Sequence, residues 1–223
     1  MNVANIIDAR NETVARVVEE VAQVTFSGGT VIFPTDTVYG IGCDPYDSRA
    51  IARIYGAKRR PDSKPLTLHL ATVAEFLEYA KDNALAITAA KRLLPGAVTL
   101  IVRRPAFISE DVTSGLGTIG FRVPDDPLCS AILERCGPLA ATSANTSGET
   151  PYRGGGDATG LPPADLLIEN GPTRNGAESS VIDLTGPTPR LLREGVVDYQ
   201  RLTELLGPVL RAAIPIRNAL NAE

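Results

Sequence analysis

The chain has 223 residues, 43% hydrophobic and 22% charged, with a net charge of −4 and a pI near 5.2. This length and hydrophobic content suffice for one α/β domain with a substantial core, and the acidic balance argues against a broad basic surface that wraps nucleic acid. There is no run of about 18 apolar residues, and the first residues show neither a cationic start nor an apolar signal segment. We therefore expect a soluble, cytoplasmic protein that does not bind membranes.

Cysteine and histidine are scarce. The cysteines, Cys43, Cys129 and Cys136, are too few for a disulfide framework and lack metal-ligand spacing. His69 is the single histidine, which excludes His-rich metal sites and any triad that needs another histidine. We expect cations, hydroxyls and backbone groups to carry the chemistry.

The first half of the chain alternates between predicted helices and strands. Valines at helical spacing predict a helix within 11–26 that ends at Ser27-Gly28-Gly29, and a capping box of Thr72 and Glu75 predicts the start of another. Further helices are expected from Asp47 or Ser48 to Tyr55 and over 84–94, with strands at 30–33 and 66–70.

The second half is richer in predicted strands. They are expected at 98–102, 118–123, 139–142, 166–168, 181–184 and 190–192, with helices over 127–136 and 199–206. Because helices become sparse after Gly137, the pattern predicts an α/β fold with a twisted open mixed sheet flanked by helices. We expect one domain over residues 1–207, a tail over 208–223, and a long loop over 146–163 that could be a lid or simply mobile surface.

Two familiar phosphate-binding motifs are ruled out. Gly115, Gly117 and Gly120 satisfy GxGxxG, but the pattern runs into a predicted strand instead of opening a helix. The GxxxxGK[ST] phosphate loop is absent from the sequence. An ATP site here must be of another kind.

Polar and cationic groups cluster where predicted strands and helices end. The segment PTDTVYG (34–40) follows a predicted strand, which is the usual location of ligand sites in open α/β sheets; the alternative is a Thr-rich turn with Asp36 as a local cap. In AKRRPDSKP (57–65), prolines fix a loop with a local excess of positive charge, which suits an anion, although such runs are often simply solvated. His69, the single histidine, is by itself weak support for a catalytic site, because a lone histidine is more often structural.

Other polar residues interrupt apolar stretches later in the chain. The run ATSAN (141–145) places hydroxyl and amide groups at a strand end, and Ser179, Ser180 and Arg193 lie near other strand ends. Arg122 interrupts an apolar strand and needs an anionic partner if it is buried, either a structural acid or a substrate carboxylate.

Taken in order, these segments resemble the YrdC/Sua5 family. The resemblance covers roughly residues 28–195 and rests on the segments GGTVIFPTDTVYGIG, YGAKRRPDSKPLTLHL, LPGAVTL, TIGFRVPDDP, ATSANTSG and SSVIDL followed by LLREG. It implies an L-threonylcarbamoyladenylate synthase that uses L-threonine, bicarbonate or carbon dioxide, and ATP. The product, threonylcarbamoyl-AMP, would serve a transferase that makes N6-threonylcarbamoyladenosine in tRNA. Mg²⁺ would be carried by ATP, with no organic cofactor and no protein metal site.

The resemblance also implies site residues, by position in the same motifs. The catalytic set is Lys58, Arg60, Ser143 and Asn145, although the roles of Arg59 and Arg60 could be exchanged. The threonine site is Thr37, His69, Arg122, Ala141 and Ser179, and the ATP site is Arg60, Lys64, Thr118, Ser143, Tyr152 and Arg193.

Two alternatives stay open. One is a carbamoyl-adenylating enzyme that uses carbamoyl phosphate. Such enzymes carry additional domains. This chain resembles the short form of the family, and we expect it to be too short for them. The other is a non-catalytic module that binds double-stranded RNA, disfavoured by the acidic net charge and the absence of Trp. For the synthase we expect at most weak contact with RNA.

Overall fold

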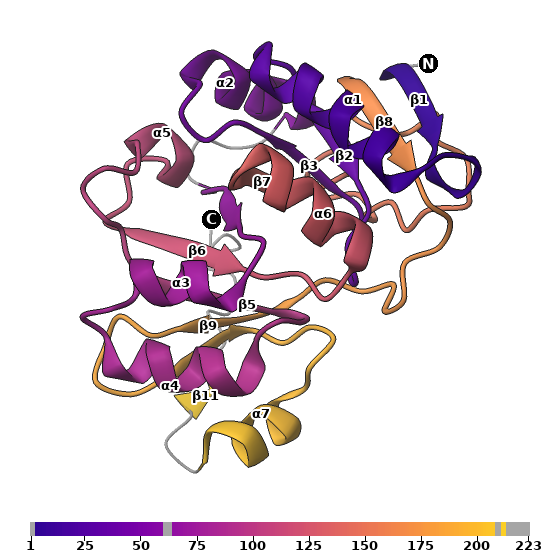
Figure 1. Ribbon diagram of the computed structural model, residues 1–223. Helices are drawn as coiled ribbons and strands as arrows, with labels where there is room; N and C mark the ends of the chain where they lie inside the picture. The colour runs from indigo at the N-terminus through magenta and orange to yellow at the C-terminus, as the bar shows by residue number, and fades with distance from the viewer. Residues whose placement is uncertain (1–2, 60–63, 208–210, 213–223) are drawn as a thin grey trace, which may run out of the picture.

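The computed structural model describes residues 3–59, 64–207 and 211–212 (Figure 1). The predicted site residue Arg60 lies outside the described residues, as does the predicted tail 208–223 apart from Arg211 and Ala212. Within the described ranges, no helix is long and apolar enough to cross a membrane. The cytoplasmic location stays a prediction.

The described strands form one 11-stranded sheet in the order β1-β8-β2-β3-β7-β4-β6-β5-β9-β10-β11. Parallel pairs such as β4–β6 and β5–β9 lie among antiparallel pairs such as β3–β7 and β5–β6, so the prediction of a mixed sheet is confirmed. The strands are β1 (Val3–Asp8), β2 (Val31–Phe33), β3 (Gly40–Cys43), β4 (Thr67–His69), β5 (Val98–Arg103), β6 (Thr118–Arg122), β7 (Leu139–Ser143), β8 (Ala164–Glu169), β9 (Ser180–Asp183), β10 (Arg190–Arg193) and β11 (Arg211–Ala212).

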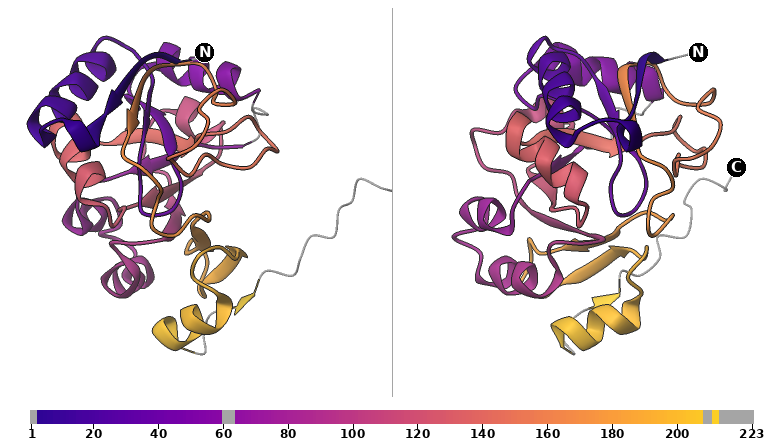
Figure 2. Two further views of the ribbon diagram at one scale, coloured as in Figure 1. Left: turned by 90° about the vertical axis from the view of Figure 1, so that its right-hand side faces the viewer. Right: turned by 45° about the vertical axis from the view of Figure 1, so that its right-hand side comes forward.

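Helices pack around this sheet in groups. α1 lies beside α6, and α4 contacts both α3 and α7 (Figure 1). Both views in Figure 2 place the indigo N-terminal strand and the yellow helix α7 at opposite ends of the molecule. The helices are α1 (Val14–Phe26), α2 (Ser48–Lys58), α3 (Val73–Tyr79), α4 (Ala84–Leu93), α5 (Glu110–Thr113), α6 (Pro127–Cys136) and α7 (Tyr199–Leu206), with a 3-10 turn at Ala9–Asn11.

The alternation of side chains along β2 separates two hydrophobic cores. Val31 and Phe33 belong to a core with Val17 of α1 and Ile132 of α6. Ile32, between them in the sequence, belongs to the larger core, which includes residues of α2, α3 and α4. Because side chains on a strand point alternately to opposite faces, the two cores lie on opposite faces of the sheet.

Most expected helices begin at a side-chain cap. Asp47 accepts hydrogen bonds from the amides of Arg49 and Ala50 at the start of α2. Thr72 accepts from the Glu75 amide as the capping box predicts, but the Glu75 carboxylate accepts from the Ala71 amide, one residue earlier than that motif requires.

The α2 boundary differs from the prediction. The helix continues past Tyr55 to Lys58, and Arg59 then adopts a left-handed conformation with φ of 48° that ends it. This extra turn brings Lys58, 1% exposed, into the interior.

Candidate functional site

A cavity of about 510 Å³ lies over the central strands of the sheet. Its lining includes Gly40 of β3, Ala141 of β7, His69 of β4, Gly120 of β6 and Thr99 of β5. Ala141 also belongs to the core beneath α1 and α6, so the cavity occupies the same face of the sheet as these helices. Side chains from distant parts of the sequence therefore meet on this face.

Glycines at positions 40 and 120 leave space at the bottom of the cavity, next to the sheet. A Cβ atom at Gly120 would lie 3.0 Å from Thr99 Cγ2 and 3.4 Å from Thr67 Oγ1. A Cβ atom at Gly40 would lie 3.3 Å from the Phe33 ring. Larger side chains at these positions would occupy the space in which a ligand would lie.

Lys58 joins the end of α2 to the end of β7. Its Nζ donates to the carbonyl oxygens of Ser143 and Asn145 and to Asn145 Oδ1 at 3.2 Å. Ser143 Oγ in turn donates to Asn145 Oδ1 at 2.6 Å. The basic segment and the ATSAN segment, far apart in the sequence, thus form one polar cluster at the cavity wall.

Arg122 forms a buried ion pair with Asp36. Arg122 Nη2 lies 2.5 Å from Asp36 Oδ1, and the side chains are 6% and 0% exposed. Within the described part of the chain, Arg122 Nε and Asp36 Oδ2 have no hydrogen-bond partner. Asp36 does not cap its own turn, which was the alternative reading of the sequence; it is the structural acid that a buried arginine requires.

His69 lies beside Arg122 in the sheet and is uncharged at neutral pH. The two residues are paired in the β4–β6 register. Burial, with a smaller contribution from the Arg122 charge, lowers the pKa of His69 to about 3. Burial also lowers the pKa of Arg122, an effect that the Asp36 carboxylate opposes. The neutral imidazole can therefore accept or donate a hydrogen bond but adds no charge.

Arg193 is held in the cavity lining by the Glu178-Ser179 segment. Its Nε donates to the Ser179 carbonyl oxygen at 3.1 Å, and its Nη1 lies 3.1 Å from Glu178 Oε2. The Ser179 hydroxyl is 2.9 Å from Thr99 Oγ1. With 43% of its side chain exposed, Arg193 remains accessible to an anionic ligand.

The loop after β2 is fixed by its own hydroxyls and by the 173–175 segment. Thr35 Oγ1 lies 3.0 Å from Thr37 Oγ1 and donates to the Val38 carbonyl oxygen at 2.6 Å. Thr173 Oγ1 donates to the Thr37 carbonyl oxygen, and the Asn175 amide donates to that of Asp36. Thr37, fully buried, is held against the cavity.

Most of the residues predicted from the sequence line this cavity, but Thr118 and Tyr152 do not. Thr118 begins β6, two residues before Gly120 and on the same face. The Tyr152 hydroxyl donates to Glu169 Oε2 at 2.6 Å. The predicted residues in the lining are Thr37, Lys58, Lys64, His69, Arg122, Ala141, Ser143, Asn145, Ser179 and Arg193.

Several residues of the site were not predicted. Glu149 and Glu178 supply carboxylates to the lining, and Thr67 and Thr99 supply hydroxyls. Thr67 could have been found from alternation, because it lies two residues before the predicted site residue His69 in β4. The sequence carried no comparable signal for Glu149.

A family model described as "Telomere recombination", Sua5/YciO/YrdC, matches residues 23–195. The chain belongs to the Sua5/YciO/YrdC family. The match includes all the strands that supply residues to the cavity lining, β3, β4, β5, β6, β7, β9 and β10, which agrees with the resemblance found from the motifs.

Two curated members of the Sua5/YciO/YrdC family illustrate the similarity. The threonylcarbamoyl-AMP synthase of Bacillus subtilis (strain 168) is 38% identical over 186 residues, which is 80% of this chain but 53% of the relative. A putative threonylcarbamoyl-AMP synthase of Mycobacterium tuberculosis (strain CDC 1551 / Oshkosh) is 35% identical and matches 81% of this chain and 85% of the relative. The chain thus spans about half of the first protein and most of the second.

Solved structures of the same family share the fold. Sua5 of P. abyssi complexed with L-threonine has a TM-score of 0.80 at 30% identity, covering 95% of this chain and 62% of that one. E. coli YciO has a TM-score of 0.75 at 28% identity, covering 90% and 98%. Full-length HypF in its phosphate- and nucleotide-bound form, 20% identical with a TM-score of 0.66, shows a shared fold alone.

Proposed function

We propose that this protein is an L-threonylcarbamoyladenylate synthase, which converts L-threonine, bicarbonate or carbon dioxide, and ATP into threonylcarbamoyl-AMP and pyrophosphate. The observation that carries the proposal is the cavity itself, which collects residues implied for both substrates from motifs spread along the chain. The names of the similar proteins, and the L-threonine in the Sua5 structure, support the same activity.

The amino acid is assigned to the part of the cavity around Arg122. The Arg122 guanidinium suits the threonine carboxylate, since its charge lies in a water-poor site where an ion pair is strengthened. Thr37 and Ser179 offer hydroxyls and His69 a neutral ring, while Ala141 leaves room for the substrate's own atoms.

ATP is assigned to the part of the cavity around Lys58. Lys58, Lys64 and Arg193 provide positive charge for the phosphates, and Arg60 is assigned there from the sequence alone. Ser143 and Asn145 orient the reacting groups. Thr118 and Tyr152 stay predicted ATP contacts; the hydrogen bond between Tyr152 and Glu169 makes the second assignment the weaker one.

The proposed chemistry needs no covalent protein nucleophile. The threonine amine first becomes a carbamate, whose oxygen attacks the α-phosphorus in line while pyrophosphate leaves. Positioning and stabilisation of charge on the phosphate oxygens are tasks for lysine and arginine.

Mg²⁺ enters this scheme bound to the ATP phosphates, where it neutralises part of their charge. The described residues contain no group of three or more His, Cys, Asp or Glu side chains that could hold a metal ion. The product would pass to a transferase that modifies tRNA adenosine, and this partner also belongs to the proposal.

The test is pyrophosphate release from ATP and Mg²⁺, with L-threonine plus bicarbonate, with carbamoyl phosphate, or with neither. Release that requires both threonine and bicarbonate is expected. Release only with carbamoyl phosphate would assign the chain to the carbamoyl-phosphate-using branch. Absence of release, together with RNA binding in an assay without ATP, would favour the RNA-binding module.

A further inference from the structure

The segment from Ser147 to Gly155 forms one wall of the cavity, and its two ends are fastened in different ways. Ser147, Gly148, Glu149 and Pro151 line the cavity, whereas Gly155 lies outside the lining. The segment belongs to the long loop over 146–163, for which the sequence favoured neither of two interpretations, a lid or a mobile surface.

The inner end of the wall is bonded to the ATP part of the site. The Ser147 amide donates to the Lys58 carbonyl oxygen at 3.0 Å, and Asn145 Nδ2 donates to the Glu149 carbonyl oxygen at 2.7 Å. The position of these wall residues is therefore coupled to that of Lys58 and Asn145.

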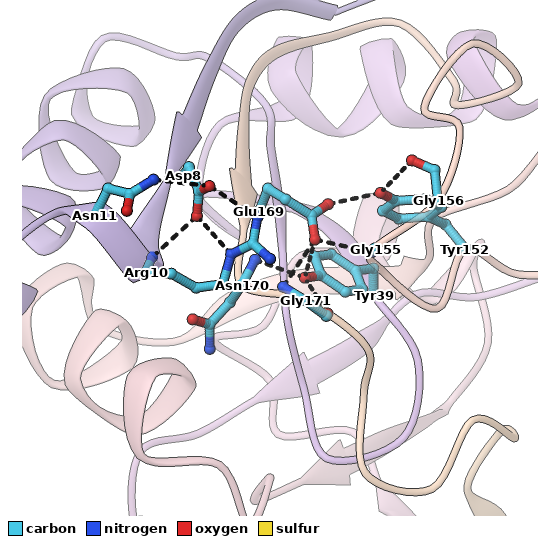
Figure 3. A network of polar contacts seen from close by, with 10 residues as sticks. All are labelled: Asp8, Arg10, Asn11, Tyr39, Tyr152, Gly155, Gly156, Glu169, Asn170 and Gly171. Atoms are coloured by element: carbon cyan, nitrogen blue, oxygen red, sulfur yellow. Dashed lines mark hydrogen bonds and ion pairs between the residues drawn. The ribbon is translucent and has the colours of Figure 1, made fainter.

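The outer end is bonded to Glu169, the last residue of β8 (Figure 3). Glu169 Oε2 accepts from the Tyr152 hydroxyl at 2.6 Å, and Oε1 accepts from the amides of Gly155 and Gly171 at 2.9 and 2.8 Å. The hydroxyl of Tyr39, a cavity residue, donates to the Gly171 carbonyl oxygen at 2.8 Å and lies 3.3 Å from Oε1. One carboxylate thus accepts hydrogen bonds from the wall and from the chain after β8.

The backbone continues the same connection. The Tyr39 amide donates to the Tyr152 carbonyl oxygen at 2.9 Å, and the Thr173 amide donates to the Arg153 carbonyl oxygen at 2.7 Å. A Cβ atom at Gly154 would lie 1.9 Å from the Gly171 carbonyl oxygen. Only glycine permits the wall to lie this close to the chain after β8.

We propose that Glu169 is a positioning residue that fixes the Ser147–Gly155 wall, so that this segment acts as a preformed side of the ATP site and not as a lid. The inference deepens the proposed function and rests on it for the identity of the ligand. Burial raises the pKa of Tyr152, which keeps its phenol protonated as a donor to the carboxylate.

Trypsin provides a test that requires no substrate. Cleavage after Arg153 needs the wall to detach, because the Arg153 carbonyl oxygen is hydrogen-bonded in place. Glu169→Ala should raise the rate of this cleavage, followed by mass spectrometry of the peptide that begins at Gly154, by about tenfold or more. Glu169→Gln should be intermediate, because its amide oxygen still accepts hydrogen bonds.

Kinetics then separate positioning from simple stability. Because the wall contacts Lys58 and Asn145, Glu169→Ala should raise the KM for ATP by about tenfold. Tyr152→Phe, a milder change, should raise it less. Both variants should change the KM for threonine less than the KM for ATP. Glu19→Gln is the matched control, because Glu19 on α1 forms an exposed ion pair with Arg135 of α6. It should change neither the cleavage after Arg153 nor the KM for either substrate.

The two experiments fail in different ways. Unchanged cleavage after Arg153 in Glu169→Ala would overturn the proposal whatever the enzyme's reaction is. Increased cleavage with equal increases in both KM values would reject the assignment of the wall to ATP. If the unmodified protein showed no synthase reaction, the proposed function would be rejected, but the conclusion from the cleavage experiment would still hold.

Discussion

At the scale of single residues, Arg122 is the strongest test of how the cavity divides between its substrates. Arg122→Ala removes the buried guanidinium assigned to the threonine carboxylate, so the KM for threonine should rise on the order of 10²-fold while that for ATP changes little. Steady-state kinetics with each substrate varied in turn would measure this, with circular dichroism as the check on folding. Equal increases in the two KM values would contradict the division.

Asp36 is expected to matter for stability more than its place in a turn would indicate. Asp36→Asn keeps the shape but leaves the Arg122 charge buried without a counter-ion, and should lower the free energy of unfolding by about 3 kcal/mol. Urea unfolding would measure the loss.

Asp125→Asn is the matched control for this prediction. The ion pair of Asp125 with Arg174 is 2.7 Å long, but the side chains are 53% and 61% exposed. Exposed pairs contribute less than about 1 kcal/mol, so the control should lose little. Similar losses in the two variants would show that burial does not determine the contribution of the Asp36 pair.

The residues of the site were predictable to the extent that each lies in a motif of its own. Lys58, Ser143 and Arg122 were placed by their motifs, and the structure brings them to one cavity. The role of Asp36 was not predictable, because its partner lies 86 residues away and local chemistry alone favoured a cap of its own turn. The contact of Tyr152 with Glu169 is non-local for the same reason.

At the scale of strands, the glycine of β6 controls the depth of the cavity. Gly120→Ala would place a Cβ atom 3.0 Å from Thr99 Cγ2 and project it into the floor, so kcat/KM should fall by about tenfold. Gly117→Ala is the control, since a Cβ atom there has no heavy atom within 4 Å. A variant Gly120→Ala with normal kinetics would show that the substrates do not reach the floor.

Three of the described strands were not predicted from the sequence, β1, β3 and the two-residue β11, and the first two were missed for identifiable reasons. β1 shows the mostly exposed pattern of an edge strand, without the buried alternation that identifies a strand. β3 contains Gly40 and Gly42, which have low strand propensity; they are accommodated because the Phe33 ring lies against both. Strands whose apolar residues are themselves buried were predicted with small boundary errors.

At the scale of the whole molecule, the order of strands in the sheet could not be predicted from local sequence patterns. β8 is inserted between β1 and β2, and β7 separates β3 from β4, so neighbours in the sheet are far apart in the chain. Periodicity and turn residues report only local structure, and the mixed α/β class followed from element order alone. Pairing across the sheet is what brings the motifs together.

The single histidine gives the whole molecule a distinct pH dependence of stability. The pKa of His69 is about 3 in the folded protein and 6.5 in the reference state, so between these values only the unfolded chain binds the proton. Its contribution is complete above about pH 6.5 and is lost as the pH falls, by about 1.4 kcal/mol per pH unit. Carboxylates begin to contribute only near pH 4.

Urea unfolding between about pH 5 and pH 7.5 isolates this contribution, because no other side-chain type has an ordinary pKa in that window. The free energy of unfolding should decrease toward acid in the unaltered protein, and His69→Gln should flatten the dependence. A slope that persists in His69→Gln would assign it to another group. If NMR of the imidazole instead showed titration near 6.5, His69 would be charged below neutral pH beside Arg122, and its role as an uncharged partner for the amino acid would be wrong.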